Sequence, residues 1–347
     1  MLMSFEMEVN FPARIVVRSS AACAVGLELS AVGAEKVVFV VDDIVSAGVA
    51  NRVAASFETA RLKWGVLAVH PEGYEIGKVD RTAGWLQGAE GVVAFGSWPA
   101  IALSKVLSWR LNAALVAVPT PHGFAEAFSR KTVPPRGFIG RFEPLKLPSS
   151  IIVDPELVIR DKLTGEEVRS SLVLEVLAGS LEALAVGWRN DFAVLLAATA
   201  VEELERSARL AQDDRSVERL LRAAVYTSIA REHAGGSALS SLARAMHALF
   251  GVCPYKAELA LVKPWAKAAW RSVQGLPLAN AYRRALCLLE EFTSGFSTLP
   301  TLPDLGLQES KLDLIVEYAW TFEHYSLERD PAVSSRFSLR RLLAEAS

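Results

Sequence analysis

The chain has 347 residues, which is long for one hydrophobic core and indicates two domains. Its 37 basic residues nearly balance its 39 acidic ones, so the composition gives no support to a nucleic-acid partner, which would favour a basic stripe. Apolar residues make up 51% and charged residues 22%, a balance that supplies a large core and argues against disorder.

Short apolar runs rich in β-branched residues alternate with amphipathic stretches through the first half of the chain. The runs are typical of buried strands and lie at 13–18, 36–41, 65–70, 91–95, 114–119 and 149–154. Helical patterns occur between them, as at 43–61 and 80–90. This alternation predicts a mostly parallel sheet covered by helices on both faces. Ligands of such sheets bind beyond the carboxyl ends of the strands.

The helical pattern takes over after about residue 160, where the short apolar runs stop. Apolar residues then recur at helical spacing through 165–188, 190–212, 215–233, 237–250, 255–273, 276–294 and 309–324. Turn residues around 153–156 separate the two halves. We therefore expect an α/β domain at 1–160 and an all-helical domain at 161–347.

The sequence shows neither a signal peptide nor a membrane span. Its first ten residues carry Glu6 and Glu8 and lack a basic region followed by an apolar core. The most apolar stretch, 171–188, is interrupted by Glu175 and Glu182 and is shorter than the ~20 apolar residues that a bilayer requires. Three scattered cysteines form no CxxC pair. We expect a cytoplasmic protein with no membrane partner.

The stretch VVAFGSWP (92–99) begins like a phosphate-binding turn. Gly96 follows an apolar strand, and a glycine there suits a tight turn whose backbone N–H groups face a phosphate. Trp98 then adds bulk where a phosphate would approach, and Pro99 has no N–H to donate. The turn is therefore predicted to be an impaired nucleotide site.

The order of the elements and several segments resemble the iron-containing alcohol dehydrogenase superfamily, which includes glycerol dehydrogenases and dehydroquinate synthases. The segments are FPARIVV (11–17), VVFVVDDIVSAG (37–48), LVAVPTPHG (115–123), SSIIVDPEL (149–157), RNDFAVLLAATAVEELERSARLA (189–211), TLPDLGL (301–307) and RDPAVSSRFSLRRLLAEA (329–346). Their collinear order covers nearly the whole chain. The resemblance implies a nucleotide-binding-type sheet, an all-α C-terminal domain, a cleft between the domains, and NAD(P)-dependent alcohol or carbonyl chemistry at an Fe or Zn ion.

The resemblance assigns cofactor positions to the loops after the strands. With Lys105 as the lysine of the family's GGGSxxDxxK loop, only Gly96 of the glycine trio matches. The second loop, PTPHGFAEA (119–127), is similar to the family's PTTAGTGSE and keeps its first threonine. Asp42 ends the second strand, where the family places an acid against the adenosine ribose, although a helix N-cap is an alternative role. The implied cofactor residues are Asp42, Gly96, Ser97, Lys105 and Thr120, and NAD(P) binding is expected to be weak or lost.

The metal ligands of the family are not matched. Its DALxHxxEA motif corresponds to EVLAGSLEA (175–183), where the aspartate becomes Glu175 and the histidine becomes Gly179. Its two later histidine ligands fall on Ser241 and Tyr255. Because a divalent transition metal prefers several imidazole, thiolate or carboxylate ligands, Glu175 alone cannot make a site, and we expect no metal. The alternative is a rebuilt site with the ligands Glu175, His122 and His247.

Three functions stay open. The first is a degenerate family member that keeps the fold without classical dehydrogenase activity. The second is a metal-free NAD(P)H-dependent reductase in which Tyr255 and Lys256 polarise a carbonyl and Tyr255 donates a proton. The third is a binding or regulatory protein for a small anionic metabolite. Its anion would be captured by basic residues of segment 129–146, namely Arg130, Lys131, Arg136, Arg141 and Lys146. Relatives are often oligomeric, so a homo-oligomer is expected.

Overall fold

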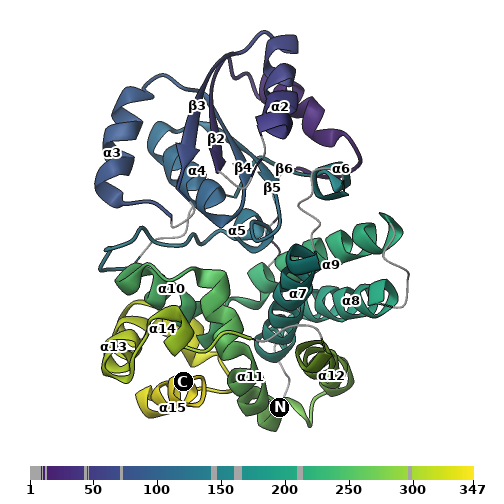
Figure 1. The fold of residues 1–347 in the computed structure, drawn as a ribbon, viewed down its shortest axis with the longest axis vertical. Helices are drawn as coiled ribbons and strands as arrows, with labels where there is room; N and C mark the ends of the chain where they lie inside the picture. Colours follow the sequence, from purple (N-terminus) through teal and green to yellow (C-terminus); the bar gives the residue numbers. More distant parts are fainter. Residues whose placement is uncertain are drawn as a thin grey trace. The chain divides into compact units, whose positions relative to one another are not determined.

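A computed structural model describes the chain (Figure 1). The described residues are 14–42, 47–70, 73–141, 147–159, 166–208, 214–295 and 299–347, together with Val9, Phe11 and Val45. Their contacts divide the chain into two compact units. Among the described residues, the α/β unit lies within Phe11–Phe138 and Phe142–Arg169, and the helical unit lies within Ser170–Ser347 with Ile139–Arg141. The boundary near residue 169 falls inside a helix.

The α/β unit contains one six-stranded sheet in which every pair of neighbours is parallel, as the sequence predicts. The strand order is β1-β6-β5-β4-β2-β3. The strands are β1 (Arg14–Val17), β2 (Lys36–Asp42), β3 (Lys63–Val69), β4 (Gly91–Gly96), β5 (Ala114–Pro119) and β6 (Ser150–Val153). Gly96 pairs with Pro119, so β4 and β5 end side by side. The loops that follow these two strands therefore begin at the same edge of the sheet.

Each strand is followed along the chain by a helix. These helices are α1 (Val25–Ala31), α2 (Ala47–Thr59), α3 (Ile76–Trp85), α4 (Trp98–Leu111), α5 (Phe124–Phe128) and α6 (Pro155–Ile159), with a 3₁₀ turn at Ala21–Ala24. Leu29 of α1 and Phe57 of α2 pack with Phe39 and Phe95 of the strands in one buried cluster. The helix predicted at 80–90 instead begins at Ile76 and ends at Trp85. It stops before Gly88, whose φ of 81° is incompatible with an α-helix.

The helical unit confirms the seven helices predicted after residue 160 and adds short ones near the C-terminus (Figure 1). The helices are α7 (Glu166–Val186), α8 (Asp191–Ala208), α9 (Asp214–Ala234), α10 (Ala238–Phe250), α11 (Pro254–Val273), α12 (Ala279–Gly295), α13 (Leu312–Phe322), α14 (His324–Glu328) and α15 (Arg336–Glu345). Ser237 and Ser240 form a reciprocal capping box at the start of α10. This box fixes where α10 begins, next to the charged side chains described below.

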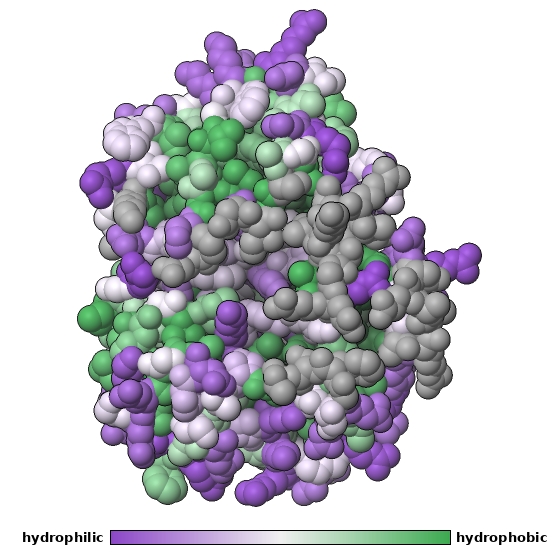
Figure 2. Space-filling view, in the orientation of Figure 1, coloured by the Kyte–Doolittle hydropathy of each residue, from purple (hydrophilic) through white to green (hydrophobic). Residues whose placement is uncertain are grey.

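The surface of the α/β unit exposes apolar side chains in the region of β3, the strand at one edge of the sheet (Figure 2). Val66 of this strand is 57% exposed and Trp64 is 38% exposed.

None of the described helices is both long enough and apolar enough to cross a membrane.

Candidate functional site

The turn between β4 and α4 is closed by a buried carboxylate. Gly96 has a φ of 143°, a conformation that glycine adopts readily, and a Cβ there would lie 2.5 Å from the carboxylate of Asp42. The backbone N–H and the hydroxyl of Ser97 both donate to Oδ2 of Asp42, each at 2.6 Å. Asp42 ends β2 and is only 2% exposed. Its side chain therefore supports this turn from inside the protein.

Two N–H groups in the first turn of α4 donate to carbonyl oxygens within the chain. Trp98 N–H donates to the carbonyl oxygen of His122 at 3.1 Å, and Ile101 N–H donates to the carbonyl oxygen of Ser97 at 3.2 Å. Pro99 has no N–H to donate. A helix N-terminus binds a phosphate through N–H groups of this turn. Donors that a pyrophosphate would need here are thus already bound to Asp42 and His122.

The loop after β5 packs directly on the same turn. Thr120 N–H donates to the carbonyl oxygen of Gly96 at 2.9 Å, and Gly123 N–H donates to the carbonyl oxygen of Thr120 at 2.9 Å. A Cβ on Gly123 would lie 2.5 Å from the Gly96 oxygen, so only glycine permits this backbone contact. The structure thus brings together four of the predicted cofactor residues, Asp42, Gly96, Ser97 and Thr120.

Lys105, the fifth predicted cofactor residue, has its Nζ in a buried cage of oxygen atoms. Nζ lies 3.2 Å from the carboxylate of Glu126 and donates to the carbonyl oxygens of Glu126, Ser129 (2.6 Å) and Lys131 (3.1 Å). Thr132 donates its hydroxyl to the same carboxylate. Lys105 therefore ties α4 to the segment after α5. Sequence reasoning missed Glu126 and Thr132, because no regular spacing links residues that a loop brings together.

These contacts test the fit of the pyrophosphate of NAD(P) to the β4–α4 turn. The turn is lined by a carboxylate, the N–H groups of Ser97 and Trp98 are bound internally, and its lysine is held by protein oxygens. The residues present do not fit a pyrophosphate as the turn stands. The assignment of Asp42, Gly96, Ser97, Lys105 and Thr120 to a cofactor stays a prediction.

The metal-ligand positions implied by the resemblance lie on α7, α10 and α11 of the helical unit. Gly179 has no room for a side chain, since a Cβ there would lie 2.5 Å from Cγ2 of Thr227 and 2.7 Å from Cδ of Arg231. Ser241 is fully buried. Tyr255 donates its hydroxyl to the carbonyl oxygen of Ser171 at 2.8 Å. These residues do not fit a transition-metal site, because glycine supplies no ligand and an arginine stem fills the adjoining space.

Arg231, a buried residue of α9, contacts carboxylates on two other helices, α7 and α11. Nε of Arg231 lies 2.6 Å from Oε2 of Glu182 on α7, and Nη2 lies 2.7 Å from Oε1 of Glu258 on α11. Burial by itself lowers the pKa of Arg231. The nearby carboxylates of Glu182 and Glu258 raise this pKa by a larger amount, so the net shift is upward. The guanidinium therefore stays charged within the helical unit.

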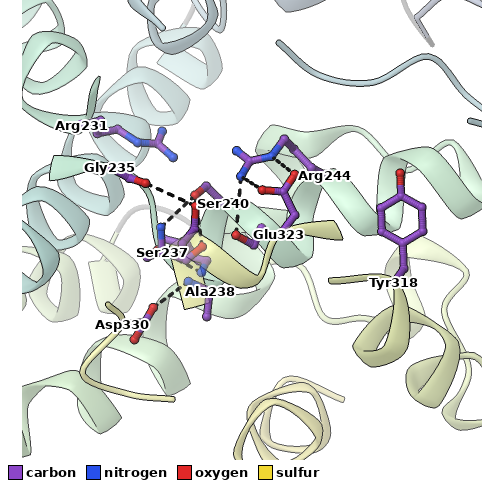
Figure 3. A network of polar contacts seen from close by, with 12 residues as sticks. Arg231, Gly235, Ser237, Ala238, Ser240, Arg244, Tyr318, Glu323 and Asp330 are labelled. Carbon is purple, nitrogen blue, oxygen red and sulfur yellow. Dashed lines mark hydrogen bonds and ion pairs between the residues drawn. The ribbon is translucent and has the colours of Figure 1, made fainter. Parts of the chain in front are cut away.

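The start of α10 extends this polar network (Figure 3). Ser237 donates its hydroxyl to Oε1 of Glu182 at 2.5 Å. Asp330 accepts from the N–H of Ala238 at 2.6 Å and from Nε1 of Trp265 at 2.9 Å. A second arginine, Arg244, makes a bidentate pair with Glu323 at 2.9 and 2.7 Å. The labelled residues of Figure 3 thus come from helices α9, α10 and α13, from the turn between α9 and α10, and from the segments around Glu323 and Asp330.

The candidates for proton transfer lie in unfavourable settings. Burial, followed by the nearby Glu175 carboxylate, raises the pKa of Tyr255 well above its ordinary value, which makes its hydroxyl a poorer acid. That hydroxyl already donates to Ser171, and Lys256 is exposed. The catalytic assignment of Tyr255 and Lys256 stays a prediction.

The alternative metal site and the basic segment are also located. Nδ1 of the fully buried His247 lies 3.0 Å from the carbonyl oxygen of Val252. Within the described ranges, no group of three or more His, Cys, Asp and Glu side chains is arranged to hold a metal ion.

In the basic segment, Arg136 pairs with Glu75 at 3.0 Å. Lys146 lies outside the described residues, so anion capture by this segment stays a prediction.

Comparison with known proteins places the fold. Residues 16–160 match the family model described as iron-containing alcohol dehydrogenase. This part of the chain is therefore similar in sequence to iron-containing alcohol dehydrogenases. No curated protein sequence matches the chain.

Solved structures of alcohol dehydrogenases share the fold along almost the whole chain. An archaeal halo-thermophilic alcohol dehydrogenase from a Red Sea brine pool is 16% identical, with a TM-score of 0.82 over 99% of this chain and 100% of its own. An iron-containing alcohol dehydrogenase from Thermotoga maritima is 14% identical, with a TM-score of 0.79 over 98% and 99%. NADH-dependent butanol dehydrogenase A from the same organism is 16% identical, with a TM-score of 0.78 over 99% and 98%.

Proposed function

We propose that this chain is an alcohol dehydrogenase-like protein that does not perform metal- and NAD(P)-dependent alcohol oxidation. The observation that carries the proposal is the closed β4–α4 turn. Ser97 donates two hydrogen bonds to Asp42, and Trp98 N–H is bound to His122. A pyrophosphate would have to displace these contacts and approach the Asp42 carboxylate, so its binding would cost several buried hydrogen bonds.

The helical unit supports the same proposal by an independent route. Gly179 and Ser241 stand at two of the implied ligand positions, and the stem of Arg231 lies where a side chain at residue 179 would project. Lewis-acid activation of an alcohol needs an ion held by several ligands with an open coordination position. The side chains present at these positions favour packing over metal binding.

Titration calorimetry with NADH and NADPH tests the cofactor part of the proposal. We expect no saturable binding, because the N–H groups of Ser97 and Trp98 are bound inside the chain. The variant Pro99→Ser restores one N–H to the turn while leaving Trp98 and Asp42 in place, so any gain in affinity would assign the defect to this turn. Saturable micromolar binding by the unmodified protein would contradict the proposal.

Metal analysis and activity assays test the chemical part. The protein would be expressed in medium supplemented with iron or zinc, and its metal content and alcohol oxidation would be measured. We expect substoichiometric metal and no turnover of an alcohol panel with NAD⁺ or NADP⁺. Stoichiometric iron or zinc together with turnover would show that this chain builds its site from other residues.

A further inference from the structure

Arg231 of α9 lies across one face of α7. That face carries two of the metal-ligand positions implied by the resemblance and one carboxylate that Arg231 contacts. Glu175, Gly179 and Glu182 are four and three residues apart, a spacing that puts them on one side of a helix. The stem of Arg231 passes over Gly179, because a Cβ there would lie 2.7 Å from its Cδ. Its guanidinium reaches Glu182 at 2.6 Å. The arginine therefore lies along the side of α7 that the resemblance assigns to metal ligands.

The carboxylates around this guanidinium need a positive charge. Side chains of Glu182 and Glu258 are 1% and 13% exposed, and both contact Arg231. Burial would raise the pKa of Glu182, but the Arg231 guanidinium and the hydroxyls of Ser237 and Ser240 outweigh it and lower that pKa. Buried carboxylates without a cation are strongly destabilising. Arg231 supplies the charge that keeps these groups in the core.

Electrostatics extend the cluster to Glu175. Its carboxylate contributes to the raised pKa of Arg231, after the larger contributions of Glu182 and Glu258. Carboxylates from α7 and α11 thus converge on one guanidinium from α9. A divalent ion and a guanidinium can both neutralise a cluster of carboxylates. The guanidinium is part of the chain, so the protein does not have to take up an ion from solution.

We propose that Arg231 is a built-in cation that takes the structural place of a metal ion in the helical unit. This inference rests on the proposed loss of metal-dependent chemistry. The Arg231 side chain fills the space beside Gly179 and neutralises Glu182 and Glu258, so the unit folds without a bound ion. Removing that side chain leaves a pocket lined by carboxylates, which binds a divalent cation.

The test compares Arg231→Ala with Arg244→Ala, in which the other buried arginine is removed. Arg244 is hydrogen-bonded only to the carboxylate of Glu323 among the carboxylates of this cluster and acts on Glu182 and Glu258 through space, so its removal leaves their ion pairs with Arg231 in place. Thermal unfolding would be followed with and without Co²⁺ and Zn²⁺, and Co²⁺ binding would be read from its visible absorption. We expect both variants to have a lower Tm, and only Arg231→Ala to gain several degrees of Tm from the metals.

Two results would overturn the proposal. One is an Arg231→Ala protein as stable as the unmodified chain, and the other is a metal response no larger than that of Arg244→Ala. Neither readout uses nucleotide binding or alcohol oxidation, so failure here is separable from failure of the proposed function.

A charge-neutral variant covers the case in which Arg231→Ala does not fold. Arg231→Met alone leaves Glu182 and Glu258 uncompensated, whereas Arg231→Met combined with Glu182→Gln and Glu258→Gln removes the charges together. We expect the triple variant to unfold at a higher temperature than the single variant and to show no Co²⁺ absorption. A triple variant less stable than Arg231→Met would contradict a role for Arg231 as the neutralising cation.

Discussion

Lys105 shows at the residue scale how a motif position can take a structural role. By the resemblance it is the lysine of a nucleotide loop, yet its Nζ is fully buried among oxygens of the segment after α5. An ammonium group in the core needs both a counter-charge and hydrogen-bond acceptors. Glu126 supplies the first, and the carbonyl oxygens of Ser129 and Lys131 supply acceptors.

We predict that Lys105→Met destabilises the protein by about 3–5 kcal/mol, because it leaves the buried Glu126 carboxylate without its cation. Urea unfolding followed by tryptophan fluorescence measures the change in the free energy of unfolding. The double variant Lys105→Met, Glu126→Gln should recover part of the loss, since the remaining amide carries no charge. A loss below about 1 kcal/mol in the single variant would show that the ion pair is not needed for stability.

At the element scale, the junction of β4 and α4 with the loop after β5 is built from close backbone contacts. Gly96 and Gly123 allow the two loops to meet, and Thr120 N–H bonds the Gly96 carbonyl across the junction. The carboxyl ends of β4 and β5 are where a parallel sheet offers a ligand site. In this protein, hydrogen bonds within the chain occupy backbone donors and acceptors at the carboxyl ends of β4 and β5.

We predict that Gly123→Ala destabilises the protein by about 1–3 kcal/mol, because its Cβ would lie 2.5 Å from the Gly96 oxygen and force the loops apart. Gly48→Ala is the matched control, since this exposed helical glycine has open space around it and should be neutral or stabilising. Chemical unfolding of both variants measures the difference. Equal stabilities would show that the loops separate without cost.

At the scale of the whole molecule, Asp330 couples distant segments of the helical unit. It accepts hydrogen bonds from Ala238 at the start of α10, from Trp265 on α11 and from Ala332 near the C-terminus. Burial raises its pKa from 3.8 to about 6 despite these three donors. Its protonation therefore affects how the C-terminal segment is held on the bundle.

This raised pKa predicts a specific pH dependence of stability. Between about pH 4 and about pH 6 the folded carboxyl keeps a proton that the unfolded chain has released, so the free energy of unfolding falls as pH rises. The shift in pKa corresponds to a decrease of about 3 kcal/mol in the free energy of unfolding, and this decrease is complete above about pH 6. Asp330→Asn removes this titration, so the stability of the unmodified protein relative to the variant should decline across that window. Parallel curves from urea unfolding at several pH values would contradict the assignment.

Much of the architecture follows from local sequence. The β-branched runs predict all six strands, and the helical periodicity after residue 160 predicts α7–α13, because each pattern reports which face of an element is buried. The end of α3 was missed, since Gly88 and its left-handed backbone outweigh the amphipathic pattern. The sequence also places Gly96, Ser97 and Thr120 at the carboxyl ends of strands, where parallel sheets bind ligands, and their assignment to a cofactor stays a prediction.

The sequence by itself determined the parallel sheet, the helical second half and which residues stand where the resemblance implies glycines and histidines, because these depend on residue type and spacing along the chain. Only the tertiary structure decided what those residues contact. The bonds of Asp42 to Ser97, of Lys105 to Glu126 and of Arg231 to Glu182 join residues dozens of positions apart or across a loop. No local pattern encodes such pairs, since they form only when packing excludes water and each buried charge must find a partner.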